Sequence, residues 1–181
     1  MIRTSNRKKT FLTIFEITVF AMLGALMFCS KIIMEALPNI HLLGMFTMVC
    51  AIVFRFKGLI PLYLYVMING LYAGFATWWV PYLYVWTILW AITMLLPRRM
   101  PRRVKLVVYP LVCFLHGAFF GVFYAPGQAL LYGMSLEATV SWILAGLPFD
   151  VLHAIGDLAA GLLILPMSEL LEKLIRKYSA R

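Results

Sequence analysis

Charged residues are scarce in this 181-residue chain: Asp, Glu, Lys and Arg together make up 13% of it. A soluble domain typically contains about 25% charged and about 45–50% apolar residues. Here 64% of the residues are hydrophobic, which is more apolar surface than the interior of so small a domain can enclose. The composition therefore excludes an ordinary soluble domain and predicts a protein whose solvent is largely lipid.

Several motifs that carry chemistry are also missing. The chain has no G-x-x-x-x-G-K-[ST] loop for ATP and no H-E-x-x-H pair for a catalytic zinc ion. No nucleophile and base stand at a recognisable spacing. The three cysteines, Cys29, Cys50 and Cys113, lie singly within apolar runs and lack the paired spacing of a zinc or redox site. We therefore expect no enzymatic activity and no cofactor.

The apolar stretches predict an all-α polytopic membrane protein with six transmembrane helices. A spanning helix needs about 20 apolar residues, because the hydrocarbon core is about 30 Å thick and each residue rises about 1.5 Å. We expect one transmembrane domain, residues 1–181, with a basic tail at 1–10 and a charged helical tail at 169–181. The predicted spans are residues 11–30, 42–54, 59–76, 82–96, 106–124 and 148–167.

The first and the last predicted span each allow a second interpretation. The first resembles a secretory signal, but it is longer than a usual signal core and contains Glu16, so we expect it to be retained.

Residues 125–135 are predicted to form a loop. Pro148 is placed in the first turn of the last span, where its missing N–H leaves no helical bond unmade. Alternatively, the residues from Leu136 onward form one long helix kinked at Pro148.

The distribution of Lys and Arg predicts that both termini lie in the cytoplasm, because short cytoplasmic loops are rich in these residues. With six spans, 15 of the 16 basic residues lie on one side and Lys31 alone lies on the other. The concentration of Lys and Arg on one side indicates loops that flank the membrane, and it argues against a nucleic-acid partner. The 15 residues are Arg3, Arg7, Lys8, Lys9, Arg55, Lys57, Arg98, Arg99, Arg102, Arg103, Lys105, Lys173, Arg176, Lys177 and Arg181.

Three ionisable residues lie in the last span, where each is costly unless it has a role. Asp150, His153 and Asp157 are spaced i, i+3 and i+7, which places them on one helical face. They line a cavity in one interpretation, and Asp150 and His153 form a structural pair in the other. His41 and His116 are not at ligand spacing with this cluster, so we expect no metal site.

Other candidate binding residues lie in the predicted outer half of the membrane. The aromatic residues Tyr82, Tyr84 and Trp86 fit either an interfacial belt or a pocket for a planar ligand. The polar candidates are Asn39, His41, Asn69 and Gln128. Asn69 and the deeper His116 are also explained by hydrogen bonds between helices.

Four features together resemble the substrate-binding S component of an energy-coupling factor (ECF) vitamin transporter. They are the six spans with both termini inside, Ala21-x-x-x-Ala25, the outer segment Leu37-Pro38-Asn39-Ile40-His41, and Pro148-Phe149-Asp150-x-x-His153. The resemblance implies a bacterial cytoplasmic membrane protein. It also implies that Ala21 and Ala25 dock on a transmembrane coupling subunit driven by two ATPases, that the outer segment closes over the ligand, and that the last helix supplies polar anchors.

The resemblance implies a vitamin-like substrate without naming it. Lys31 is the only Lys or Arg on the outer side, so charge matching favours a neutral or weakly basic heteroaromatic compound. Two other functions remain open. One is a stand-alone ion-coupled carrier with Asp150, His153 and Asp157 as a relay. The other is a scaffold subunit that transports nothing.

Overall fold

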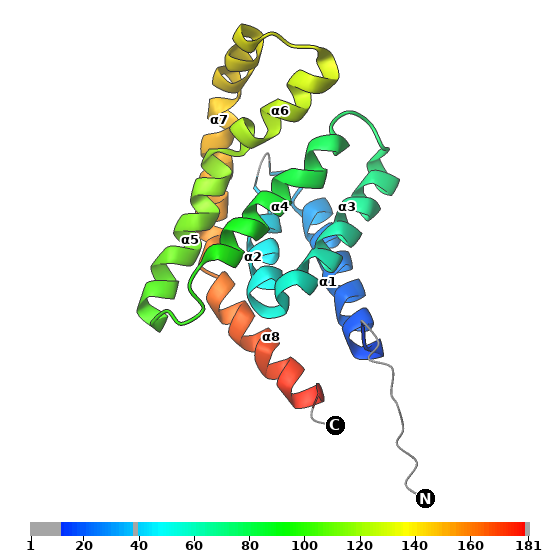
Figure 1. Cartoon of the computed structure of the whole chain (residues 1–181), viewed down its shortest axis with the longest axis vertical. Helices are drawn as coiled ribbons and strands as arrows, with labels where there is room; N and C mark the ends of the chain where they lie inside the picture. Colours follow the sequence, from blue (N-terminus) through cyan, green and yellow to red (C-terminus); the bar gives the residue numbers. More distant parts are fainter. Residues whose placement is uncertain (1–11, 38–39, 180–181) are drawn as a thin grey trace, which may run out of the picture.

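The described part of this computed structural model, residues 12–37 and 40–179, consists of helices joined by short connections, without a strand. The chain is an all-α membrane protein (Figure 1). The helices are α1 (Ile14–Ile33), α2 (Leu43–Phe54), the 3-10 turn η1 (Arg55–Gly58), α3 (Leu59–Ala73), α4 (Trp79–Leu95), α5 (Arg102–Ala118), α6 (Phe120–Tyr132), α7 (Leu136–Gly161) and α8 (Ile164–Ser179).

The helices are consistent with six passes, which are α1, α2, α3, α4, the stretch of α5 and α6, and α7. The stretches Ile14–Ile33, Leu43–Ala73, Arg102–Tyr132 and Leu136–Gly161 are long and apolar enough to cross a membrane, and α4 is a shorter apolar helix. The second stretch contains two passes, because the chain turns back at η1 between α2 and α3. As a result α1 begins and α8 ends at the same end of the molecule (Figure 1).

The helix α2 forms the centre of the bundle. Its 12 residues span only about 18 Å, less than the hydrocarbon core of a bilayer. Every residue from Leu43 to Ala51 is buried, so other helices surround it in place of lipid. It packs chiefly against α4 and α8, with Met48 and Trp86 among the fully buried side chains. Because α2 is short, the segment before it lies between the outer ends of the other helices.

Local sequence signals explain where several helices begin and end. Thr13 accepts a hydrogen bond from the N–H of Glu16, whose carboxylate accepts one from the N–H of Thr13, and this capping box starts α1. Ser135 caps α7 through the N–H of Ala138. Gly133 ends α6 with φ of 61°, a left-handed conformation that glycine adopts without strain.

The structure corrects three predictions about the second half of the chain. Pro148 lies inside α7 rather than in the first turn of a span, because the helix already starts at the Ser135 cap, and the alternative of one long helix from Leu136 is thereby confirmed. Residues 125–132 were predicted to be loop but belong to α6, which contains Pro126 within it. The charged tail does not continue the last span: α7 ends at Gly161, and α8 starts afresh at Ile164.

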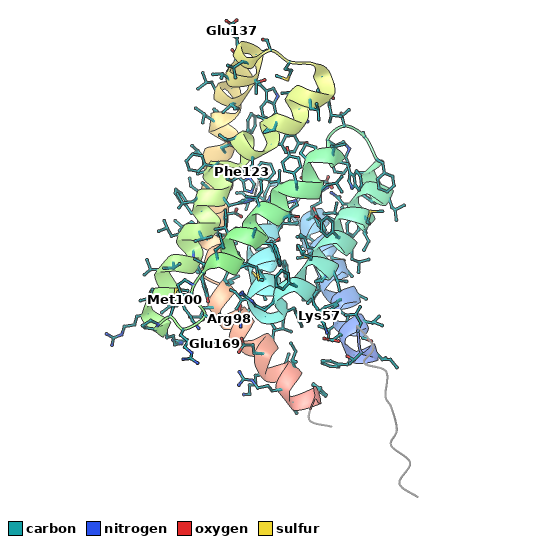
Figure 2. All side chains as sticks on the ribbon, in the orientation of Figure 1. Lys57, Arg98, Met100, Phe123, Glu137 and Glu169 are labelled. Carbon is teal, nitrogen blue, oxygen red and sulfur yellow. The ribbon has the colours of Figure 1, made fainter. Side chains whose placement is uncertain are left out.

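Ion pairs join the helices at the basic end. Lys57 of η1 lies 2.6 Å from Glu16 of α1, and Arg102 of α5 lies 3.2 Å from Glu169 of α8. Figure 2 shows Lys57, Arg98, Met100 and Glu169 near this end, and Glu137 at the opposite end. This arrangement agrees with the segregation of basic residues in the sequence.

Cysteine labelling tests this topology. In a variant with the three native cysteines replaced, a cysteine at Glu35 or Glu137 should react with an impermeant maleimide in intact cells. A cysteine at Arg99 should react only after the cells are permeabilised, because the basic loop is expected in the cytoplasm. Labelling at Arg99 in intact cells would contradict the six-span topology, and total labelling in permeabilised cells controls for expression.

Candidate functional site

The polar face predicted for the last span is present on α7. Asp150, His153 and Asp157 are 6%, 3% and 1% exposed, and all three point into the bundle. The helix packs along α5, where Gly117 allows the two backbones to approach closely. The i, i+3, i+7 spacing therefore correctly predicted one buried stripe. Its members nevertheless divide into two separate environments.

Asp150 stabilises the junction between α5 and α6. Its two carboxylate oxygens lie 3.1 and 3.2 Å from the backbone N–H of Gly121 and accept its hydrogen bond. This N–H is in the first turn of α6, where no helical carbonyl can accept it. A Cβ on Gly121 would lie 2.5 Å from Asp150 Oδ2, so the contact requires glycine. Asp150 pairs with this backbone group, and the predicted Asp150–His153 pair is not formed.

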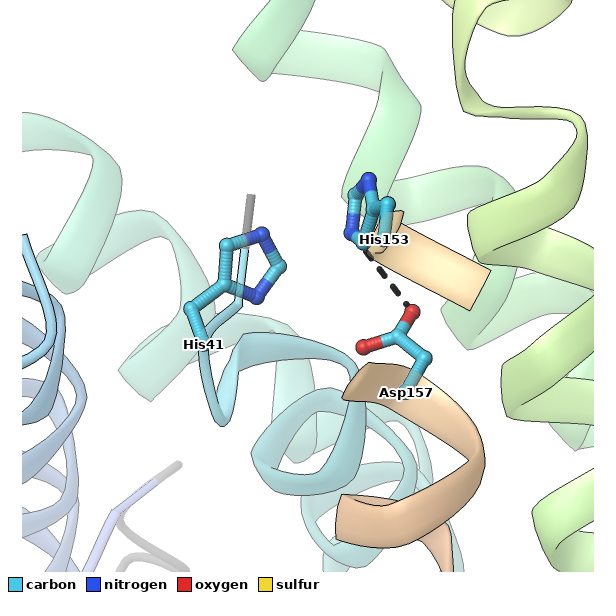
Figure 3. A group of neighbouring side chains, drawn as sticks. All are labelled: His41, His153 and Asp157. Carbon is cyan, nitrogen blue, oxygen red and sulfur yellow. Dashed lines mark ion pairs between the residues drawn. The ribbon is translucent and has the colours of Figure 1, made fainter. Parts of the chain in front are cut away.

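His153 and Asp157 are neighbours one helical turn apart, and His41 faces them from the segment before α2 (Figure 3). The distance from His153 Nε2 to Asp157 Oδ2 is 3.6 Å. The His41 and His153 rings are 4.6 Å apart and nearly perpendicular. The expectation that His41 stands apart from the cluster is therefore wrong. The first residues of the short helix α2 lie beside α7, and His41 comes just before them in the chain.

The Asp157 carboxylate occupies a space left by two glycines. A Cβ on Gly44 would lie 3.0 Å from Oδ1, and a Cβ on Gly117 would lie 3.0 Å from Oδ2. Among the described residues neither oxygen has a well-formed hydrogen bond. Besides His153, the polar group beside the carboxylate is the thiol of Cys113, which is a weak donor. An acidic group is thus held in the interior with most of its hydrogen-bonding capacity unused.

A pocket of about 190 Å³ lies directly above this cluster. Its aromatic wall consists of Tyr82, Trp86 and Phe120, with ring centroids 5.6 to 5.9 Å apart between Trp86 and its two neighbours. Lys31 and Glu35 form a 3.0 Å ion pair at the pocket. Other residues that line it are Tyr65, His41 and His153. The pocket therefore combines flat apolar surfaces with two imidazoles.

Several predicted binding residues lie elsewhere. The Tyr84 hydroxyl donates to the carbonyl of Tyr124 and accepts from the N–H of Gly127, so it joins α4 to α6. Gln128 lies on α6 and Asn69 is buried on α3, and neither lines the pocket. Asn39 lies outside the described residues.

Other lining residues were not predicted from the sequence. Tyr65 and Phe120 belong to the pocket but were not candidates. The aromatic periodicity of α3 and α6 is the only signal that could have indicated them. His116 Nε2 lies 3.1 Å from the carbonyl oxygen of Val85, which agrees with a structural role.

The small residues of α1 divide between two faces. Gly24 packs against α3, where a Cβ would lie 2.9 Å from the Leu64 side chain. Ala21 and Ala25 are exposed, whereas the neighbouring Met22 and Leu26 line an apolar groove between α1 and α8. Among the described residues the side of α1 that carries Ala21 and Ala25 has no partner helix, so it is free to contact lipid or another protein.

No family model, curated protein or solved structure matches this chain. The possible chemistry of the site therefore follows from its own geometry. The pocket offers aromatic surfaces for stacking and two imidazoles, with the buried Asp157 carboxylate next to the imidazole of His153. These groups can bind a planar solute, exchange protons or coordinate a metal ion.

The local role of Asp150 gives a stability prediction. Asp150→Ala should destabilise the protein by about 1.5–3 kcal/mol, because it removes a charge-assisted hydrogen bond to a buried N–H. Gly121→Ala should have a similar effect by displacing the carboxylate. Thermal unfolding in detergent measures both, with Glu137→Ala, an exposed acidic position on the same helix, as the control. Unchanged stability in both test variants would contradict the assignment.

Proposed function

We propose that this chain is the S component of an ECF-type importer and captures a small vitamin-like solute at the outer face of the membrane. The observation that carries the proposal is the pocket of about 190 Å³ at the outer end of the bundle. It is lined by the segment between α1 and α2 and by residues of α3, α4, α6 and α7. A binding site in which several helices and one connecting segment converge suits capture followed by release.

The lining favours a small heteroaromatic solute. Sites for drug-sized ligands occupy about 300–1,000 Å³, so this pocket suits a compound of one or two rings. Tyr82, Trp86 and Phe120 supply ring faces, and His41 and His153 supply polar contacts. Lys31 is paired with Glu35, so the described lining has no unpaired ammonium group to attract a strongly anionic solute.

The exposed side of α1 that carries Ala21 and Ala25 supports docking to a membrane partner. The chain has no ATP-binding loop, so energy for uptake must come from other subunits or from an ion gradient. Ala21 and Ala25 leave a shallow surface on α1 against which another helix can pack closely. The proposed partners are a transmembrane coupling subunit and two ATPase subunits in the bacterial cytoplasmic membrane.

The solute can be identified directly. Mass spectrometry of protein purified in detergent and then denatured should detect one enriched small heteroaromatic compound. Tyr82→Leu should weaken its binding about tenfold, because a stacking contact contributes about 0.5–1.5 kcal/mol beyond the area it buries. Trp142→Leu, an aromatic change on α7 outside the pocket lining, should retain the compound. Equal retention by both variants would remove the pocket from the binding site.

Coupling is tested separately from binding. In cells that express the coupling subunit and both ATPases, Ala21→Trp and Ala25→Trp should abolish uptake, because the added bulk prevents close helix packing. The same variants should retain the solute when purified. Ile155→Trp places the same indole side chain at an exposed position of α7 and should transport normally. Normal uptake by both alanine variants would show that this face does not dock.

A stand-alone ion-coupled carrier is the second candidate, and the buried His153–Asp157 neighbours favour it because such groups can relay protons. Uptake that persists without ATPases and stops when the proton gradient is dissipated would identify this carrier. A purified protein that retains no solute would instead indicate a scaffold subunit.

A further inference from the structure

Three potential metal ligands converge at the floor of the pocket. One donor atom each from His41, His153 and Asp157 lies within 4.8 Å of the others (Figure 3). The ligands come from two distant parts of the chain, the segment before α2 and the middle of α7. His153 and Asp157 are almost completely buried, and His41 lies at the edge of the pocket.

Hydrogen bonding within the protein leaves these donors largely unused. The Nδ1 atom of His41, the Nε2 atom of His153 and both oxygens of Asp157 have no hydrogen-bond partner among the described residues. The 3.6 Å between His153 and Asp157 is longer than a good hydrogen bond. Unsatisfied polar groups are costly inside a membrane protein, since the surrounding hydrocarbon supplies no substitute. Such a cluster is expected to hold a ligand.

We propose that His41, His153 and Asp157 bind one divalent transition-metal ion. Two imidazoles and one carboxylate suit zinc, cobalt, nickel or ferrous iron, whereas magnesium and calcium prefer oxygen ligands alone. Neighbouring ligand atoms in a tetrahedral zinc site are about 3.4 Å apart, as follows from metal–ligand bonds of about 2.0–2.1 Å. The 3.6 Å between His153 and Asp157 matches this spacing. The His41 donor, within 4.8 Å of the other two, moves closer when the ion binds.

The ion would leave one coordination position open toward the pocket. Three protein ligands make an incomplete tetrahedral set, and two of them, His41 and His153, also line the pocket. A lone-pair donor of the bound solute can complete the coordination. This last step rests on the proposed solute-binding function, but the metal site itself does not.

Metal binding is measured on the full-length protein after tag removal and chelator treatment, without solute or partners. After Zn²⁺ is added back and the excess removed by gel filtration, elemental analysis should find one Zn²⁺ per chain, and Co²⁺ should give the visible bands of a tetrahedral nitrogen–oxygen site. His41→Gln and His153→Gln should weaken Zn²⁺ binding by more than about 100-fold in chelator competition, since even outer-shell partners contribute about 10–100-fold. His116→Gln is the matched control, because His116 is equally buried but contacts Val85.

The outcomes separate this site from the proposed function. Wild-type protein that binds no stoichiometric Zn²⁺ and gives no Co²⁺ bands overturns the metal site, whether or not the variants fold. Equal Zn²⁺ affinity in His41→Gln, His153→Gln and the control, all monodisperse by gel filtration, overturns it as well. A retained solute in metal-free protein would leave the S-component proposal standing. Stoichiometric metal without ATPase-dependent uptake would leave only the metal site.

Discussion

The close approach of α5 to α7 is the packing interaction on which the polar interior depends. Gly117 lies against the backbone of Ala154, where a Cβ would come within 3.0 Å of its Cα. Gly161 lies against Pro110, where a Cβ would come within 2.6 Å. Helices in lipid are held together by van der Waals packing and hydrogen bonds rather than by the hydrophobic effect. These small residues therefore fix the two helices and also leave room for carboxylates between them.

The two carboxylates on α7 occupy this interface in different ways. Asp150 meets the start of α6, where a backbone N–H has no helical acceptor. The Asp150 carboxylate therefore uses its hydrogen-bonding capacity on this N–H. Asp157 lies two turns further along, between Gly117 of α5 and Gly44 in the first turn of α2. Its oxygens have no hydrogen-bond partner among the described residues, and the side chains of His153, Cys113 and His41 lie close to it. The position of the α5–α6 break thus decides which carboxylate is structural and which is available for binding.

The sequence predicted features that depend on local periodicity and missed those that depend on distant contacts. Helical spacing correctly placed Asp157 and His153 on one buried face, and the basic loops predicted the alternation of spans. The proximity of His41 could not be predicted, because it follows from how deeply the short α2 lies in the bundle. Proline was misleading at Pro126, which lies inside α6, whereas the alternative of one long helix through Pro148 is confirmed.

A bound metal ion would change which solutes the pocket prefers. Without it, the only lysine of the described lining is paired with Glu35, and the pocket offers a solute the imidazoles of His41 and His153. A divalent ion held by two neutral imidazoles and one carboxylate adds a net positive charge at the floor and attracts a lone-pair donor or an anion. The donor groups of the retained solute therefore indicate whether the floor is occupied during capture.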